Sequence, residues 1–421
     1  MEIAKFRLFR ANGVLIRQYS LGRLACLLIL VPGSTFGATI YTAKTGSDGY
    51  TCTQVQSEST PKLTIAGGIS CMSSGDTLIV KAGTYNESLN NLPSGSPGNY
   101  TTIKANPTDT VIISRSGGAA MRAFNGNGKS YIEFDGLIIT GADLYNGIKI
   151  QGGSHHLRIQ NCEIYGAETS GILDNTGNTG TFSGGNEILN NSIHNNGRLN
   201  SKLDHGLYLT SSDNIVWDND FYNNSGYGVS NWTSGLYSQN NNYQYNRIYN
   251  NGTAGESGGI TVKGFNHVVA NNLVWDNAAG GIWTLGGNNN QFYYNTVYNN
   301  RGAGNGGGIT TVGSSNTLVT NNIIYANSAN INDLGSGTVF NSNLMTNPSF
   351  VNAAANDFRI QPGSPARDSG VALAGTIYDF DKVPRPQGGG VDIGAYEYTD
   401  SLPTTANKIP NPPSALSASA N

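Results

Sequence analysis

Short stretches in which apolar and polar residues alternate recur along most of the chain. Seven of them, between residues 161 and 325, share one phrase: a polar residue or pair, usually Asn, then a variable residue, an apolar residue and an aromatic residue or His. A repeat of 20 to 50 residues is typical of a solenoid, in which each turn buries its apolar residues against its neighbours. The apolar members lie 23 to 29 residues apart and are Ile164, Ile193, Phe221, Ile248, Val274, Val297 and Ile324.

A second series of short segments keeps step with the first and begins with Gly, where the chain must bend. A further apolar segment, such as 267–270, precedes the Asn pair. The alternation has the two-residue period of strands, so each turn is expected to hold three short parallel strands. The residues of the second series that are expected to point inward are Ile148, Ile172, Leu207, Val229, Ile260, Ile282 and Ile309.

With three such strands per turn, residues 76–345 resemble the right-handed parallel β-helix proteins of the pectate-lyase-like superfamily. The resemblance implies an all-β solenoid of three sheets. Residues 60–71 have apolar residues at helical spacing and resemble the helix that caps the first coil of such proteins, so we assign 38–75 to an N-terminal cap.

The last part of the chain shows another resemblance. Residues 358–370 and 384–398 resemble the closing segment of many bacterial surface β-helix proteins, and we expect 346–398 to form a C-terminal cap. Residues 399–421 are rich in Pro, Ser, Ala and Asn and are expected to be a linker or tail.

The N-terminus has the composition of an export signal. Basic residues precede an apolar run at 24–31, and small residues follow it, which predicts a signal peptide over residues 1–37. No later segment is long and apolar enough to span a bilayer. We therefore expect a secreted protein, either extracellular, at the cell surface or periplasmic. Cys52 and Cys71 flank a loop that a disulfide can close there, whereas Cys162 is expected to be a buried free thiol.

Charge limits the range of partners. The chain has 24 Lys and Arg against 27 Asp and Glu, and only 12% of its residues are charged. Such a composition argues against binding of nucleic acid. A monomer is expected.

The repeated phrase itself predicts structure rather than chemistry. Its Asn residues are expected at the turn between the second and third strands, where Asn tolerates a left-handed conformation and amides can bond from coil to coil. The aromatic residues beside them, including His194, are expected to stack as a stabilising column, with sugar binding as the second interpretation. The Asn positions are Asn191, Asn219, Asn246, Asn272, Asn295 and Asn322.

The family resemblance implies that chemistry occurs on the outer face of the first strand of each coil. Alternation predicts one outward row of Lys149, Leu173, Tyr208, Ser230, Thr261, Trp283 and Thr310. A second row, two residues on, holds Gln151, Asn175, Thr210, Trp232, Lys263, Leu285 and Val312. We predict that Lys149, Trp232, Lys263 and Trp283 bind substrate; a solvated sheet face, or indoles packed under loops, is the plainer interpretation.

A charged cluster lies in the longest interval between these strands. Arg198, Lys202, Asp204 and His205 fall within eight residues, in a chain where charge is rare. Glu168 lies four residues before Ile172, and Asp204 three residues before Leu207 on the next coil. We therefore expect the two carboxylates roughly 5 to 8 Å apart. These two carboxylates can hold calcium or supply acid and base, or the cluster forms surface ion pairs that hold the loop down.

These residues lead to an enzymatic hypothesis. We expect a polysaccharide lyase that cleaves an acidic glycan by β-elimination, with Arg198 or calcium on Glu168 and Asp204 neutralising the uronate. Lys202 or His205 is the expected base, and Tyr208 the expected proton donor. Sequence motifs of classical pectate lyases and polygalacturonases are absent from the chain. A glycoside hydrolase, a uronate epimerase and a non-catalytic glycan-binding surface protein remain the alternatives.

Overall fold

The computed structural model describes much of the chain but not its two ends. The predicted signal peptide and tail fall almost wholly outside the described residues. Near the N-terminus, β1 (Leu8–Ala11) and β2 (Val14–Arg17) form an antiparallel pair. Within the described residues no helix has the length and apolar character needed to cross a bilayer. The described ranges are 8–11, 14–17, 37–114, 124–141, 145–175, 184–233, 238–255, 257–302, 306–375 and 378–400.

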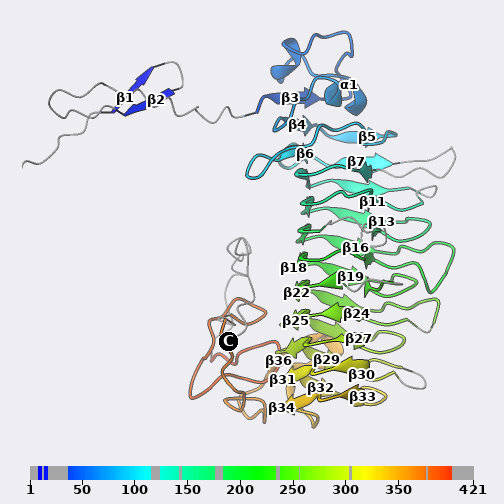
Figure 1. The fold of residues 1–421 in the computed structure, drawn as a ribbon, viewed down its shortest axis with the longest axis vertical. Coiled ribbons are helices and arrows are strands. Elements are labelled where there is room, and N and C mark those ends of the chain that lie inside the picture. Colours follow the sequence, from blue (N-terminus) through cyan, green and yellow to red (C-terminus); the bar gives the residue numbers. More distant parts are fainter. Residues whose placement is uncertain are drawn as a thin grey trace, which may run out of the picture.

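Three parallel sheets wind around one apolar interior, which confirms the predicted all-β solenoid (Figure 1). The first sheet carries the segments that begin with Gly, and the short β21 (Ser238–Gln239) pairs with its strand β24. The path of sheet 1 is β8 (Phe124–Asn127), β11 (Ile148–Gln151), β14 (Ile172–Asp174), β17 (Leu207–Leu209), β20 (Val229–Asn231), β24 (Ile260–Phe265), β27 (Ile282–Asn288), β30 (Ile309–Ser315) and β33 (Ile331–Ser336).

The other two sheets follow in the same order on every coil. Sheet 2 runs through β3 (Thr39–Thr42), β4 (Thr77–Val80), β6 (Thr101–Ala105), β9 (Ile132–Asp135), β12 (Arg158–Gln160), β15 (Glu187–Leu189), β18 (Ile215–Trp217), β22 (Asn242–Gln244), β25 (Val268–Ala270), β28 (Gln291–Tyr293), β31 (Leu318–Thr320) and β34 (Val339–Asn341). Sheet 3 carries the repeated phrase and runs through β5 (Gly83–Tyr85), β7 (Val111–Ser114), β10 (Ile138–Thr140), β13 (Glu163–Tyr165), β16 (Ser192–His194), β19 (Asp220–Tyr222), β23 (Arg247–Tyr249), β26 (Leu273–Trp275), β29 (Thr296–Tyr298) and β32 (Ile323–Tyr325).

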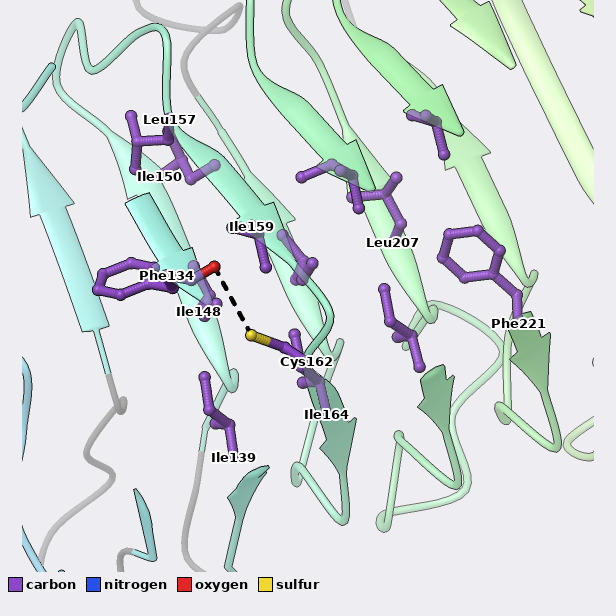
Figure 2. Close-up of a cluster of buried hydrophobic side chains, with 14 of the residues drawn as sticks. Phe134, Ile139, Ile148, Ile150, Leu157, Ile159, Cys162, Ile164, Leu207 and Phe221 are labelled. Carbon is purple, nitrogen blue, oxygen red and sulfur yellow. Dashed lines mark hydrogen bonds between the residues drawn. The ribbon is translucent and has the colours of Figure 1, made fainter. Parts of the chain in front are cut away.

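The interior is built from the apolar residues of the repeats. The seven apolar residues of the phrase lie in register on sheet 3, and all are fully buried. The inward residues predicted for sheet 1 are also fully buried. Cys162 lies among them as a free thiol, and its Sγ contacts the carbonyl oxygen of Phe134 at 3.8 Å (Figure 2). Burial raises the pKa of this thiol to about 12, so it is a core residue, as predicted.

The N-terminal end is closed by a short helix, α1 (Ile65–Ile69), within the segment predicted to form the cap. Its buried residues Ile65 and Ile69 belong to the same apolar cluster as the coils. The Thr64 hydroxyl caps the helix by accepting the N–H of Gly67 at 2.9 Å. A disulfide joins Cys52, before the helix and near η1 (Gln54–Gln56), to Cys71, two residues after it.

A ladder of buried Asn amides connects the coils at the corner between sheets 2 and 3. Each Nδ2 donates to the Oδ1 of the next rung at 2.9 to 3.0 Å, and each backbone N–H donates to the same oxygen. The ladder ends at Asn343, which accepts from Asn322. The predicted structural role is confirmed, but the left-handed residue of each turn is the one before the rung, such as Asn190 or Asp218.

Two more ladders were not predicted. One follows sheet 3, at the corner that leads to sheet 1, and consists of Asn196, Asn224, Asn251, Asn277, Asn300 and Asn327. The other lies between sheets 1 and 2 and contains Asn186, Asn214, Asn241, His267 and Asn290. His267 replaces an amide there, because its ring Nδ1 accepts the backbone N–H of Asn241 at 3.2 Å, and its backbone N–H donates to Asn290 Oδ1 at 2.9 Å.

The predicted aromatic column is formed on sheet 3. Four successive pairs from Tyr165 to Trp275 are stacked, with ring centroids 4.3 to 5.2 Å apart. His194 is one of these rings and also contacts Glu163 at 3.1 Å. Beyond Trp275 the column is covered, because Phe358 packs edge-on against that indole at 5.3 Å.

Phe358 belongs to the segment predicted to be a C-terminal cap, which packs along the flank of the later coils (Figure 1). The segment contains β35 (Phe350–Asn352), η3 (Ala353–Ala355) and β36 (Asp357–Ile360). A fully buried ion pair, Arg385 with Glu397 at 2.6 Å, fastens it. The same guanidinium donates to Asn271 Oδ1 at 3.2 Å and lies 4.2 Å from the ring centroid of Tyr294.

Removal of one rung should destabilise the solenoid. Asn246 accepts two hydrogen bonds from Asn219 and donates to Val216 O and to Asn272 Oδ1. Each buried group left without a partner costs about 1 to 3 kcal/mol, so we expect Asn246→Ala to lose about 3 kcal/mol or more in urea unfolding followed by circular dichroism. The matched control is Asn125→Ala, an exposed Asn of β8, which should change stability by less than about 0.5 kcal/mol. Equal losses in the two variants would contradict a special role for the ladder.

Candidate functional site

The outward row predicted on sheet 1 exists, but part of it is covered. Tyr208, Ser230, Thr261, Trp283 and Thr310 lie in register on successive strands. Ser230, Thr261 and Thr310 are at most 3% exposed. This stretch of the face is therefore not the solvated surface that simple alternation suggests.

Two carboxyl groups come together at the N-terminal edge of sheet 1, where strands receive the chain from sheet 3. Asp204 precedes β17 and is 9% exposed, while Glu168 precedes β14 and is half-buried. Burial, and then the charge of Glu168, raise the pKa of Asp204 to about 6. The charge of Glu168 thus acts on Asp204, as the predicted proximity requires, and Asp204 keeps its proton to a higher pH than an exposed Asp does.

The loop that carries Asp204 is fastened to both neighbouring coils. On one side the N–H of Gly197 donates to Thr169 O at 2.8 Å. On the other side Asp204 O accepts the N–H of Gly226 at 2.6 Å and the hydroxyl of Ser225 at 3.2 Å. The insertion is consequently a rigid support for the carboxyl group.

His205 is held in a different state from the one its predicted role requires. Its Nδ1 accepts the backbone N–H of Tyr227 at 2.9 Å, and the backbone N–H of His205 donates to the Ser170 hydroxyl. Burial lowers the imidazole pKa to about 3. The ring is therefore neutral, with its proton on Nε2, and can donate a hydrogen bond. This geometry does not fit the predicted role of His205 as the base.

An aromatic strip runs from the carboxyl pair along the solenoid axis. The His205 ring lies 5.2 Å from Tyr208 and 5.7 Å from Tyr227, and Tyr227 lies 6.4 Å from Trp283. Burial raises the pKa of Tyr227 to about 12 and also raises that of Tyr208, so both phenols stay protonated at neutral pH. Trp283 needs a glycine neighbour, because a Cβ on Gly280 would lie 1.6 Å from the indole Nε1.

Tyr227 is the member of this strip that sequence reasoning missed. It stands between two glycines in a turn, outside the alternating segments. The signal that identifies it is positional: it lies two residues before Val229, as His205 lies two residues before Leu207.

The basic residues predicted for the site occupy separate places. Arg198 and Lys202 are exposed on the Asp204 loop, and Lys202 O accepts the Ser257 hydroxyl at 3.0 Å, so this loop also contacts the chain two coils further on. Lys149 is half-buried on β11 and is separated from Tyr208 in the row by Leu173.

Trp232 and Lys263 form a second group at the opposite edge of sheet 1, toward the C-terminal ends of its strands. Trp232 is 40% exposed, and the Lys263 ammonium lies 4.8 Å from its ring centroid. Lys263 also donates to Thr233 O at 2.9 Å. The structure therefore joins these two residues to each other and leaves them apart from the edge that carries Asp204.

Other acidic residues have structural partners. Asp220 binds Arg247 through paired hydrogen bonds, and Asp218 is a left-handed turn residue at the corner between sheets 2 and 3. Among the described residues no three His, Cys, Asp or Glu side chains converge as a metal would require.

Comparisons with known proteins agree with the architecture. The family model described as "Right handed beta helix region" matches residues 122–297, whereas no curated protein sequence matches the chain. Pectate lyase Pel9A aligns with a TM-score of 0.62 at 17% identity, over 86% of this chain and 96% of that one.

Two further solved structures align less closely. XylC in complex with xylose aligns with a TM-score of 0.54 at 14% identity, over 70% of this chain and 69% of that one. The alginate lyase from Paenibacillus sp. str. FPU-7 aligns with a TM-score of 0.50 at 17% identity, over 66% and 95%. At these identities the likeness concerns the fold. The protein is a right-handed parallel β-helix protein with the pectate-lyase-like fold.

Proposed function

We propose that the protein is a secreted polysaccharide lyase that cleaves an acidic glycan by β-elimination beside Asp204. The observation that carries the proposal is the buried carboxyl group of Asp204, next to Glu168 and at the head of an aromatic strip on the outer face of sheet 1. The Cys52–Cys71 disulfide supports an oxidising compartment. Two solved structures with this fold carry the word lyase in their names, which supports the reaction class.

Asp204, Arg198, Tyr208 and Lys202 are proposed to share the steps of β-elimination. β-Elimination requires that the uronate carboxylate be neutralised, the adjacent proton removed and the leaving oxygen protonated. Asp204 in its protonated form donates a hydrogen bond to the uronate carboxylate, with the exposed Arg198 as the charged partner. Tyr208, kept protonated by burial, supplies the proton for the leaving oxygen, and Lys202 acts as the base.

The aromatic strip and the basic residues bind the rest of the chain. Tyr227 and Trp283 line the path that leads away from Asp204 toward later coils, and aromatic rings suit the apolar faces of sugars. Lys149 and the pair of Trp232 and Lys263 are proposed to contact sugars on either side of this path. His205 positions the strip and offers its Nε2 proton to a substrate oxygen.

Calcium is the second candidate for the neutralising group. Glu168 and Asp204 would supply two of the six to eight oxygens that this ion prefers. Calcium binding requires both carboxylates to be ionised, so it predicts the opposite pH dependence from the hydrogen-bonding role.

A glycoside hydrolase is favoured by one specific feature, the raised pKa of Asp204 beside a second carboxyl group, that of Glu168. Asp204 would act as general acid and Glu168 as the carboxylate that completes the reaction. A uronate epimerase would use the same groups as the lyase without cleaving the chain. A glycan-binding surface protein would use the aromatic strip alone.

The reaction class is tested on pectate, alginate and glycosaminoglycans with the exported protein. We expect depolymerisation of one of them with a rise in the ultraviolet absorbance of the unsaturated product. New reducing ends without this absorbance would replace the lyase with the hydrolase. An altered epimer composition without cleavage would indicate an epimerase, and binding alone would indicate the surface protein.

Variants of Asp204 separate its possible roles. Asn also donates a hydrogen bond, so Asp204→Asn should keep activity within about tenfold of wild type, whereas Asp204→Ala should lose about 100-fold in kcat. The ratio of wild-type activity to that of Asp204→Asn should fall as the pH rises through about 6, because both enzymes share the same base and only the wild type loses the proton of Asp204. Asp213→Asn is the matched control, because Asp213 is exposed at the other edge of sheet 1.

Two results would contradict the hydrogen-bonding role. Loss of activity in Asp204→Asn as complete as in Asp204→Ala would indicate a proton donor or a metal ligand. A requirement for calcium, shown by loss with EDTA and by activity that increases above pH 6, would assign the carboxyl pair to the metal.

Stability should report the same carboxyl group without any substrate. The pKa of Asp204 is raised from 3.8 to about 6, so its contribution to stability is complete below pH 3.8 and is lost as the pH rises through about 6. Asp204→Asn removes the buried charge and should raise the melting temperature at pH 8 but not at pH 3.5. Differential scanning calorimetry at both values checks this, and a lower melting temperature at pH 8 would refute it.

A further inference from the structure

Four aromatic side chains stand at corners of the coils where the backbone is left-handed. Most residues with this conformation are Asn, Asp or Gly, which tolerate it. Among the described residues, four such positions carry Tyr or His instead, with φ between 54° and 58°. A bulky side chain is strained there, so it persists where the surrounding structure makes use of it. These residues are Tyr131, His156, Tyr245 and Tyr294.

Two of the four rings hold the C-terminal segment through their hydroxyl groups. The Tyr245 hydroxyl donates to Tyr378 O at 3.3 Å. The Tyr294 hydroxyl donates to Val371 O at 2.9 Å. Each of these left-handed corners is therefore a docking point for a polypeptide segment that lies outside the coils.

The faces of the same two rings receive basic side chains. Lys382 Nζ lies 3.8 Å from the ring centroid of Tyr245, and the guanidinium carbon of Arg385 lies 4.2 Å from that of Tyr294. Both cations come from one short stretch, residues 382–386, which reads Lys-Val-Pro-Arg-Pro. A basic, proline-containing stretch is thus what these corners bind.

The other two rings, Tyr131 and His156, lie at the corner between sheets 1 and 2, on the coils of β9 and β12. They are stacked with their centroids 4.8 Å apart, and His155 packs edge-on against both. Both are half-buried, and neither belongs to the apolar cluster that the C-terminal segment forms with the later coils. The same position on the following coils is occupied by Gly185, Asp213, Asn240, Asn266, Asn289 and Asn316.

The tail contains a second copy of the docked sequence. Residues 408–412 read Lys-Ile-Pro-Asn-Pro, which repeats the order Lys, aliphatic residue, Pro, any residue and Pro of residues 382–386. This copy falls outside the described part of the chain. Proline keeps such a stretch extended before it binds, so an aromatic surface binds it with a small loss of conformational entropy. The tail is therefore the occupant that the chain itself offers to the second pair of rings.

Carboxylates accompany both pairs of rings. Burial lowers the pKa of Lys382 to about 8, and the charge of Asp218 opposes this shift. Burial also lowers the pKa of His156, and the charges of Glu187 and Asp213 oppose that shift. A lysine that docks at either corner therefore meets negative charge.

The length of the tail fits the distance to be covered. Asp400 is the last described residue and belongs to the flank of the later coils; the eight residues from there to Lys408 span at most about 29 Å. The path from Tyr245 to His156 crosses three coils and the width of sheet 2, which is about 22 Å at the usual spacings of strands and residues. The tail can therefore reach the stacked pair within one copy of the chain.

We propose that residues 408–412 bind across Tyr131 and His156 of the same chain, as residues 382–386 bind to the later coils. Lys408 then lies against the aromatic rings, and the prolines pack beside it. The segment expected to be a linker or tail becomes a strap that ties the early coils to the C-terminal segment. This inference does not depend on the proposed enzymatic function.

Trypsin cleavage after Lys408 tests the strap on the exported protein, with the released peptide 409–421 measured by mass spectrometry. The segment must leave its docking site to be cut, so the rate follows the undocked population. We expect Tyr131→Asn and His156→Asn to raise this rate about tenfold or more, toward that of a free synthetic peptide of residues 401–421. Asn is the residue that later coils carry at this position, so both variants should keep the circular dichroism spectrum of wild type.

The control is Asn266→Gly, which changes the same corner position on a later coil and should leave the cleavage rate unchanged. Wild-type protein cut as fast as the free peptide would overturn the proposal. Slow cleavage that persists in both Asn variants would mean that the tail docks elsewhere, and would overturn it as well. Protection that is lost on dilution from about 100 to 1 µM would mean that the tail of a second copy binds, which contradicts docking within one chain.

Discussion

Buried amide ladders fix the axial position of every coil. Each Asn side chain accepts two hydrogen bonds from the preceding rung and donates to the next rung and to a backbone carbonyl. A coil that shifted relative to its neighbour would therefore leave buried polar groups without hydrogen-bond partners. Three corners of the coil are tied in this way. Residues that lie the same number of positions from their ladder Asn therefore face each other on successive coils. Loops between two ladder positions can be longer without disturbing the sheets.

The candidate site uses this rigidity to bury a carboxyl group. The loop that carries Asp204 departs from the regular coil, yet hydrogen bonds to the coils before and after it hold it against the sheet. Burial then changes the chemistry of the side chains: it raises the pKa of Asp204 to about 6, and at neutral pH it keeps His205 neutral and the nearby phenols uncharged. Such a site is better suited to hydrogen-bond donation than to base catalysis by imidazole.

Much of the fold was predictable because each copy of the repeated phrase corresponds to one coil of the solenoid. Val274 and Ile248 occupy equal places in their phrases, so their register on sheet 3 could be obtained from spacing alone. The proximity of Glu168 and Asp204 followed from the same reasoning. Tertiary partners could not be obtained in this way: the bond from Tyr227 N to His205 Nδ1 joins two irregular turns, and it occupies the ring nitrogen that a neutral imidazole base would use. The flank position of residues 346–398 also depends on contacts that no local pattern encodes.

The residues on the outer face of sheet 3 change from polar to apolar where residues 346–398 pack against it. Along one row, Glu163, Ser192, Asp220 and Arg247 give way to Leu273 and Ile323, which are buried beneath the segment. A plain solenoid makes only neighbour contacts and can fray one coil at a time. Here Arg385 binds Asn271, 114 residues earlier, and Tyr245 binds Tyr378, 133 residues later. The later coils are complete only when residues 378–397 have packed against them, so these coils should fold last and open as one cooperative unit. The earlier coils, which carry Asp204, do not depend on this segment.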